Sequence, residues 1–438
     1  MSSFSIISLG CPRNLVDSEY IINKLVADGF RFKEDVQKVE IVIINTCGFI
    51  KEAKEEAIDV ILDVVELKKH GKVKKIIVGG CLCERYGEEL AAEIPEVDAI
   101  LGINWDEISV IVRSLEKGKI LRLRKEKKLL PFLSCRRVQL TPFHYTYLKI
   151  SEGCSNRCSY CAIYNIKGKH RSKGMETILK EAKLAISRGV KEINIIAQDS
   201  TSYGIDLYGR PKLSELLKKI CRLRGEFWVR VLYMHPARID EMLIDCFRHL
   251  SKLCKYIDLP IQHINDRILK MMNRKTRKSQ IIRLIEKLRK EIPDICLRTT
   301  VIVGFPGEGE GEFKELLNFI QEVKFERLGC FIYSREEGTP AYDLKPQIPQ
   351  KEKQARFDII MKTQQKIALE VNSRFTGKEY KVLVDEETDD FYIGRAYFDA
   401  PEVDGVIYME KNKMVEVGKF VNARITSSIE YDLFAEIT

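Results

Sequence analysis

The first hundred residues alternate between short apolar runs and longer amphipathic stretches. In the longer stretches apolar residues recur every three or four positions, as on one face of a helix, whereas the short runs have the length of buried strands. This alternation predicts βαβ units and a parallel sheet. The expected strands cover residues 4–9, 41–44 and 76–78, and the expected helices cover 15–27, 51–69 and 84–94.

The same alternation returns in the middle of the chain. Six apolar runs with helical stretches between them predict six β/α units, two fewer than in a complete TIM barrel. The expected architecture is therefore a partial (β/α)6 barrel with its chemistry at the carboxyl ends of the strands. The expected strands lie near 147–150, 193–197, 228–233, 256–259, 297–303 and 328–333.

The end of the chain changes character. A long helical stretch, 350–372, leads into five short apolar runs separated by turn residues, and this pattern is typical of a small β-barrel. The fold class is thus α/β with a β-barrel appended. We expect four segments: an N-terminal α/β domain at 1–125, a basic linker at 126–142, the partial barrel at 143–372 and the β-barrel at 373–438.

Composition agrees with a globular enzyme of several domains. The 438 residues are 45% hydrophobic and 31% charged, and no apolar run approaches the ~20 residues that span a bilayer. The first residues lack the basic segment of a signal peptide, so we expect a cytoplasmic protein without a membrane partner. In that reducing compartment the 13 cysteines favour metal or redox ligation over disulfides.

Charge is unevenly distributed along the chain. Residues 373–438 hold eight Lys/Arg against fourteen Asp/Glu, a net charge of −6. Since the whole chain carries +9, residues 1–372 carry +15. Because phosphate contacts require Lys and Arg, an acidic tail argues against RNA binding. Such a module can instead steer a basic protein towards the enzyme, and we expect the tail to help dock a basic protein segment.

Three cysteines follow the first expected strand of the barrel. Cys154, Cys158 and Cys161 form a CxxxCxxC pattern, and the next cysteine in the sequence is Cys221. Three thiolates that hold a four-iron cluster leave one iron open to bind a further ligand. The spacing therefore predicts a cluster that takes part in chemistry.

Three more cysteines each follow an expected strand of the N-terminal domain. Because carboxyl ends of parallel strands share one edge, Cys11, Cys47 and Cys81 are expected to converge there. The alternative is that all three are buried small hydrophobes. Cys83 competes with Cys81 for the third position, and we favour Cys81 because it follows two glycines. The remaining cysteines are expected to be structural: Cys135, Cys221, Cys246, Cys254, Cys296 and Cys330.

CxxxCxxC with Tyr160 before the last cysteine resembles the radical S-adenosylmethionine (SAM) superfamily. The whole chain resembles its methylthiotransferase family, which ends in a TRAM domain, and within it the RimO branch rather than the tRNA-modifying MiaB branch. The motifs that carry the resemblance are Ser8–Glu19, Asn45–Ile50, Gly79–Leu82, Ala197–Gly204 and Asp399–Gly405.

The resemblance implies two [4Fe–4S] clusters. Cys154, Cys158 and Cys161 would bind the cluster whose open iron chelates SAM. Cys11, Cys47 and Cys81 would hold an auxiliary cluster that carries the sulfur to be inserted. The implied activity adds a methylthio group to the β-carbon of an aspartate in small-subunit ribosomal protein S-twelve, with an electron donor that the sequence does not identify.

Further contacts to SAM are implied near the strand ends. Tyr160 would pack against the cofactor. Gln198, Gln262, Arg298 and Tyr333 are expected at or near the carboxyl ends of strands, where each could instead satisfy a buried backbone group. The sequence departs from the family pattern at Tyr164 and Lys167, where proline and arginine are usual, and at 309–313.

Three alternatives remain open. A MiaB-type tRNA methylthiotransferase would use the same clusters on RNA. Another radical SAM enzyme with an accessory cluster would consume SAM without adding a methylthio group. A non-catalytic, metal-stabilised RNA-binding protein is disfavoured because neither three-cysteine set has a nearby fourth Cys or His ligand.

Overall fold

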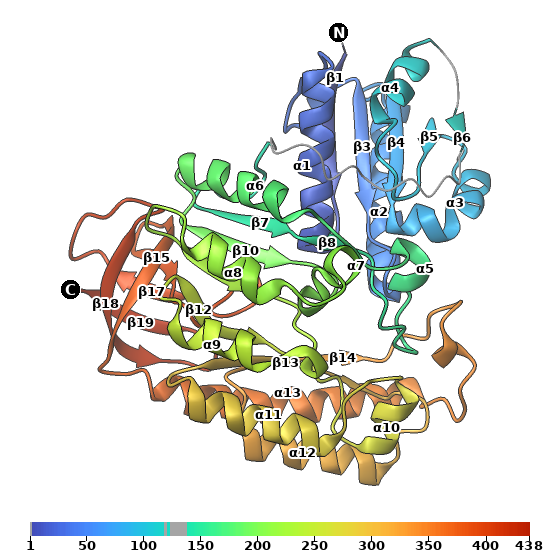
Figure 1. The fold of residues 1–438 in the computed structure, drawn as a ribbon. Helices are drawn as coiled ribbons and strands as arrows, with labels where there is room; N and C mark the ends of the chain where they lie inside the picture. The colour runs from blue at the N-terminus through green and yellow to red at the C-terminus, as the bar shows by residue number, and fades with distance from the viewer. Residues whose placement is uncertain (1, 118–120, 123–137) are drawn as a thin grey trace. The chain divides into compact units, whose positions relative to one another are not determined.

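The structure is a computed structural model that describes residues 2–117, 121–122 and 138–438 (Figure 1). Residues 126–137 of the expected linker, including Cys135, lie outside the described residues. The chain divides into two compact units. The first contains Met1–Leu140, Glu152–Ser155 and Cys161–Glu181, and the second contains Thr141–Ser151, Asn156–Tyr160 and Ala182–Thr438.

The first unit contains a six-stranded, all-parallel sheet with the strand order β2-β1-β3-β4-β5-β6. The parallel sheet expected from the apolar runs is confirmed, and the central strands are longer than those runs. The short strands β2, β5 and β6 were not foreseen, because two-residue strands leave no periodic pattern. The strands are β1 (Ser3–Ser8), β2 (Arg31–Phe32), β3 (Ile41–Thr46), β4 (Lys75–Gly80), β5 (Ala99–Ile100) and β6 (Leu121–Arg122).

Helices cover both faces of this sheet. Apolar side chains of α1 and α4 form one core with Ile41, Ile43 and Ile77, and those of α2 and α3 form a second core with Val42 and Ile44. Alternate residues of β3 thus point into opposite cores, which explains why the strand reads as a continuous apolar run. The helices of this unit are α1 (Pro12–Ala27), α2 (Lys51–Lys69), α3 (Cys81–Glu93), α4 (Ile108–Glu116) and α5 (Ile163–Lys167).

The second unit holds the expected partial barrel. Its six parallel strands are ordered β14-β13-β12-β11-β10-β7, so each strand neighbours the next one along the chain. Figure 1 shows α8, α9, α11, α12 and α13 along the outer side of this sheet. The strands are β7 (Tyr145–Lys149), β10 (Glu192–Ile196), β11 (Trp228–Val231), β12 (Leu253–Asp258), β13 (Cys296–Val303) and β14 (Arg327–Ile332).

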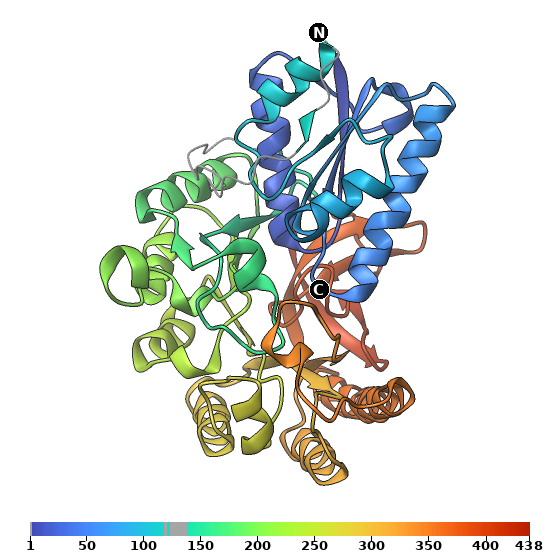
Figure 2. The same ribbon diagram turned by 90° about the vertical axis from the view of Figure 1, so that its right-hand side faces the viewer.

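The connections between these strands are mostly helical, and Figure 2 shows several of the later helices end-on. The short strands β8 (Ser151–Glu152) and β9 (Arg171–Ser172) pair with each other. No helix in the described part of the chain is both long and apolar enough to cross a membrane. The helices are α6 (Met175–Ser187), α7 (Ile205–Tyr208), α8 (Leu213–Cys221), α9 (Glu241–His249), α10 (Asp266–Met271), α11 (Lys278–Glu291), α12 (Glu310–Val323) and α13 (Gln350–Ser373).

The C-terminal segment is the closed five-stranded barrel predicted from the sequence. Its strands are ordered β15-β16-β17-β19-β18, and closure removes the exposed sheet edges. The long helix α13 leads directly into it. The strands are β15 (Glu379–Glu387), β16 (Phe391–Arg395), β17 (Ile407–Glu410), β18 (Phe420–Ser428) and β19 (Leu433–Ile437).

Buried charges join this small barrel to the parallel strands. Glu192, the first residue of β10, accepts hydrogen bonds from Arg230 of β11 at 2.8 Å and from Arg395 of β16 at 2.6 Å. All three side chains are at most 4% exposed. One buried carboxylate therefore holds one arginine from the sheet and one from the barrel.

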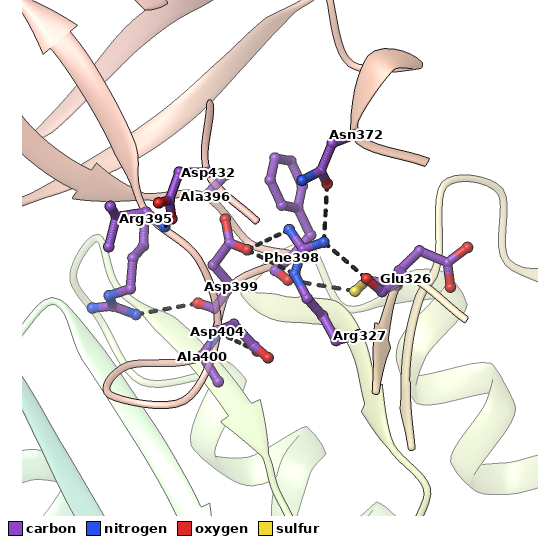
Figure 3. Close-up of polar contacts among 12 residues, drawn as sticks. Glu326, Arg327, Asn372, Arg395, Ala396, Phe398, Asp399, Ala400, Asp404 and Asp432 are labelled. Carbon is purple, nitrogen blue, oxygen red and sulfur yellow. Dashed lines mark hydrogen bonds and ion pairs between the residues drawn. The ribbon is translucent and has the colours of Figure 1, made fainter. Parts of the chain in front are cut away.

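A second buried set lies in the loop after β16 (Figure 3). Arg327, the first residue of β14, donates to Asp399 at 2.6 Å and to Asn372 of α13 at 3.0 Å. Asp404 of the same loop lies 3.4 Å from Arg298 and accepts a hydrogen bond from Tyr256. The motif Asp399–Gly405 thus fastens the small barrel to the strands of the partial barrel.

Removing Asp399 is expected to destabilise this unit strongly. Asp399→Ala leaves the guanidinium of Arg327 buried without its carboxylate, and breaking a buried pair in this way costs about 3–5 kcal/mol. The exposed Asp390→Ala is the matched control and should change stability by less than about 0.5 kcal/mol. Urea unfolding of both variants tests this, and equal midpoints would show that the buried pair contributes little.

Candidate iron–sulfur sites

Cys11, Cys47 and Cys81 lie at the carboxyl ends of neighbouring strands. Cys11 precedes α1 three residues after β1, Cys47 directly follows β3, and Cys81 opens α3 directly after β4. Their thiols act on one another, because Cys47 and Cys11 both contribute to raising the pKa of Cys81. The structure thus brings the three cysteines to the same sheet edge, as the sequence indicated.

The backbone at this edge is closely packed. Gly10 has a φ of +86°, and a Cβ there would lie 2.9 Å from the Sγ of Cys47. Gly80 has a φ of +101°, and its Cβ would lie 2.6 Å from the carbonyl oxygen of Thr46. Glycine is required at both positions for conformation and for space.

Two asparagines fix the strand ends beside the cysteines. The side chain of Asn14 donates to the carbonyls of Leu9 and Thr46, both at 3.0 Å. The side chain of Asn45 donates to the carbonyl of Asn14 at 2.9 Å and to the Ser18 hydroxyl at 3.0 Å. Both asparagines stand inside the motifs quoted above, but their supporting role was not anticipated, since three of these four hydrogen bonds join residues about 30 positions apart.

The pKa values of two of these thiols are shifted in opposite directions. Burial acts to raise the pKa of Cys11, but Arg13 and the backbone N–H of Asn14 outweigh it, so the net pKa is lowered. Burial raises the pKa of Cys81 to about 12, although Lys167 acts in the opposite direction. Because metal ligands must be thiolates, Cys11 is the thiol best prepared for ligation.

Cys83 differs from Cys81 in its surroundings. Cys83 is buried in the apolar core formed by α2, α3 and the sheet, whereas Cys81 lies in a separate small cluster with Ile103, Ala162 and Ile166. Burial raises the pKa of Cys83 to about 12, with Thr46 as its hydrogen-bond partner. A thiol inside an aliphatic core has less room for a cluster, which supports the preference for Cys81.

The second cysteine set lies in the loop after β7. Cys154 and Cys161 belong to the first unit and Cys158 to the second. In the first unit, the backbone N–H of Cys154 donates to the carbonyl of Gly168 at 3.1 Å. In the second unit, Arg274 lies with Nη1 3.7 Å from the Sγ of Cys158. Nothing in the sequence indicated that Arg274 lies beside this loop, because Arg274 is far along the chain from every quoted motif.

A buried polar network holds the residues next to Cys158. Asn156 donates to Asp199 at 2.8 Å, and Arg238 donates to both, at 2.8 Å to Asp199 and 2.7 Å to Asn156. Thr201 and Ser202 also donate to Asp199. Burial acts to raise the pKa of Asp199, but Arg238, His235 and the hydroxyls lower it overall, so the carboxylate stays charged. Asp199 therefore positions this part of the loop.

The other expected SAM contacts occupy different places. Gln198 stands two residues after β10 and Tyr333 directly after β14, so both lie at strand carboxyl ends as expected. Gln262 follows β12 and pairs with Val301 of β13 through an isolated parallel β-bridge. The φ of Gln262 is +72°. Tyr160 packs against an apolar cluster that includes Tyr333.

The expectation that Arg298 lies near a strand carboxyl end is wrong. It is the third residue of β13, five residues before that strand ends. Its guanidinium lies 3.3 Å from Asp258 and 3.4 Å from Asp404 of the small barrel. The sequence run 297–303 located the strand correctly, but the periodic pattern does not tell which end of it meets another domain.

The remaining cysteines in the described residues sit in regular elements. Cys246, Cys254, Cys296 and Cys330 are buried in α9, β12, β13 and β14, and Cys221 ends α8. Among all the residues that the structure describes, both three-cysteine sets included, no group of three or more His, Cys, Asp or Glu side chains is arranged to hold a single metal ion. A four-iron cluster differs from such a site in that each thiolate binds a different iron.

Comparisons with known proteins cover the whole chain. Residues 148–320 match the radical SAM superfamily, residues 3–102 match a family described as uncharacterized protein family UPF0004, and residues 376–438 match the TRAM domain. Solved structures resemble the fold at low identity. The radical SAM methyltransferase TsrM from Kitasatospora setae has a TM-score of 0.60 at 12% identity, covering 77% of this chain and 73% of that chain.

Curated relatives are much closer in sequence. The ribosomal protein uS12 methylthiotransferase RimO of Clostridioides difficile is 46% identical, covering 100% of this chain and 99% of the relative. The enzyme of the same name from Thermoanaerobacter is 45% identical over 100% of both chains. That from Geobacter sulfurreducens is 44% identical over 99% of this chain and 98% of the relative. The chain therefore belongs to the RimO family of radical SAM methylthiotransferases, enzymes that work with SAM and [4Fe–4S] clusters.

Proposed function

We propose that this enzyme adds a methylthio group to the β-carbon of an aspartate in ribosomal protein uS12. We also propose that Cys11, Cys47 and Cys81 hold its auxiliary cluster, and that Cys154, Cys158 and Cys161 hold its SAM-binding cluster. One observation carries the proposal. Relatives named as uS12 methylthiotransferases match the chain from end to end at 44–46% identity, across both cysteine sets.

The residues at the N-terminal sheet edge fit a cluster of this kind. Three cysteines from three neighbouring strands face a common edge, and iron–sulfur clusters are held by such thiolates. Gly10 keeps side-chain atoms away from Cys47, and Asn14 and Asn45 fix the strand ends that carry the thiols. The protein's part is to hold the ligands in place.

The residues around Cys158 have a similar task. When bound, the clusters and SAM would supply the radical and the sulfur for the reaction. Asp199 fixes Asn156 and thus the start of the loop, and the guanidinium of Arg274 places positive charge beside the Sγ of Cys158. Positive charge at this place would partly offset the negative charge of a ligating thiolate.

The small barrel offers an acidic surface for a basic protein. Asp385, Asp399 and Asp404 contact His144 or arginines within their unit and do not present free charge to a partner. Nine acids of the small barrel are exposed, and four of them lie together at the turn between β15 and β16, where Glu387 also pairs with Lys411 at 2.7 Å. This acidic turn consists of Glu386, Glu387, Asp389 and Asp390. We propose that it attracts uS12 by electrostatic steering.

Neutralising the acidic turn tests this step. Changing its four residues to Gln or Asn should raise KM for uS12 several-fold at low salt and leave kcat unchanged, because steering acts on encounter. The difference from the parent enzyme should vanish at high salt, where the charges are screened. A KM that is unchanged at low salt would rule out steering by this turn.

The substrate itself is tested with the reconstituted enzyme. The chain is loaded anaerobically with iron and sulfide and given SAM, a reductant, and uS12 and tRNA together in equal amounts. We expect mass spectrometry to find the methylthio group on an aspartate of uS12. Modification of tRNA alone would replace the proposal with a MiaB-type activity, and SAM consumption without either product would indicate a different radical SAM reaction.

A further inference from the structure

A buried ammonium group lies beside the N-terminal cysteines. Lys167 ends α5 and is only 5% exposed. Its Nζ lies 3.3 Å from Asp17 and 3.8 Å from Glu152, and both carboxylates are buried as well. Burying a charged lysine is costly unless partners compensate for the lost hydration, so its position calls for a physical reason.

The helices around Lys167 place it next to two of the cysteines. Helix α5 packs against α3, whose first residue is Cys81, and Ile166 shares a small apolar cluster with that cysteine. Asp17 stands on α1, which begins directly after Cys11. Lys167 therefore connects the two helices that start at Cys11 and Cys81.

The charges of these groups act on one another. Burial acts to lower the pKa of Lys167, but Glu152 and Asp17, and then the thiols of Cys81 and Cys11, raise it well above its ordinary value. In turn Lys167 acts to lower the pKa of Cys81. The ammonium is therefore held in its charged form near the thiols of Cys81 and Cys11.

The two carboxylates do not use the full capacity of the ammonium. Charge-assisted N–H···O bonds are about 2.7–2.9 Å long, and both Lys167 contacts are longer. An ammonium has three N–H donors, and Lys167 donates one hydrogen bond to these two carboxylates, to Asp17. If Lys167 served only to pair a buried acid, closer contacts would be expected.

We propose that Lys167 is the electrostatic partner of the auxiliary cluster and that its buried ammonium stabilises the cluster's negative charge. The inference rests on the proposed assignment of Cys11, Cys47 and Cys81 as cluster ligands. Donors to cluster sulfurs and nearby positive charge raise the reduction potential. Asp17 and Glu152 hold the ammonium in place and partly offset its charge.

The reduction potential of the auxiliary cluster provides the test. A full-length chain with alanine at Cys154, Cys158 and Cys161 is reconstituted so that it keeps this cluster alone, and its potential is measured by a redox titration followed by electron paramagnetic resonance. We expect Lys167→Met to lower the potential and Lys167→Arg to restore it towards the parent value. Asp17→Asn should shift it the opposite way, because the ammonium is then less compensated.

The outcomes separate the two proposals. A Lys167→Met chain with full iron content and an unshifted potential would overturn the inference while leaving the cluster assignment intact. If Lys167→Met fails to assemble, Asp17→Asn decides, and an unchanged or lowered potential in that variant overturns the inference. A parent chain that binds no cluster would overturn the assignment of the three cysteines, and the inference with it.

Discussion

Alanine at Cys154, Cys158 or Cys161 is expected to reduce SAM cleavage to background and abolish methylthio transfer with it. Three thiolates bind three irons of a four-iron cluster and leave the fourth open for SAM, so the loss of one ligand removes the cluster or its SAM site. Formation of 5′-deoxyadenosine, measured by chromatography, reports the loss. Iron content should fall from about eight to about four atoms per chain, because the auxiliary cluster remains.

Cys221→Ala is the control for these variants. Cys221 ends α8 and stands outside both cysteine sets, so its loss should leave iron content and deoxyadenosine formation near the parent values. Parent-level SAM cleavage in Cys154→Ala, Cys158→Ala and Cys161→Ala would contradict the assignment of this loop. So would a loss of all the iron, since the second cluster would then not be independent.

Alanine at Cys81 should separate the two halves of the reaction. We expect Cys81→Ala to abolish methylthio transfer to uS12, because the auxiliary cluster loses a ligand, while deoxyadenosine still forms at the intact SAM-binding cluster. Both products are measured in the same incubation. Retained deoxyadenosine formation shows that the protein is folded and that the defect is confined to sulfur insertion.

Cys83→Ala is the matched variant, two residues away on the same helix. Because Cys83 lies in the aliphatic core, its replacement removes one buried sulfur and should leave methylthio transfer intact, with a modest loss of stability. The reverse pattern, with Cys83→Ala inactive and Cys81→Ala active, would move the third ligand to Cys83.

The fold could be predicted largely from hydrophobic periodicity. The long buried strands and amphipathic helices leave clear patterns, so both parallel sheets were expected from runs such as 41–44 and 297–303, and the small barrel was expected from the five short runs after residue 372. Strands of two residues, such as β2 and β5, carry no periodicity and were missed. Their pairing is decided by neighbours distant in sequence.

Cys11, Cys47 and Cys81 could be proposed from sequence because they follow strands whose ends share an edge, and the cysteines of the second set because of their CxxxCxxC spacing. The groups that support them could not. Lys167 and Arg274 carry charge, and a charged residue in a sequence is most simply interpreted as exposed. In the structure Lys167 is buried and Arg274 is half-buried, and their partners, Asp17 and the carbonyl of Pro260, are brought to them only by the tertiary fold.

The acidic tail shows that a charge count from the sequence does not reveal which charges are paired within the fold. Its net charge of −6 was correct, but Asp385, Asp399 and Asp404 are paired with residues of the same unit. The negative charge available to a partner is therefore smaller than the count suggests, and its densest group is the acidic turn between β15 and β16. The motif Asp399–Gly405, which marked the RimO branch, serves as an attachment between domains in this structure (Figure 3).

Deuterium transfer tests the central claim most directly. Ribosomal protein uS12 carrying deuterium at its aspartate β-carbons is incubated with the reconstituted enzyme, SAM and a reductant, and both products are analysed by mass spectrometry. The account predicts that deuterium appears in 5′-deoxyadenosine and is lost from the one aspartate that gains the methylthio group. Methylthiolated uS12 with unlabelled deoxyadenosine, or labelled deoxyadenosine without methylthiolated uS12, would contradict it.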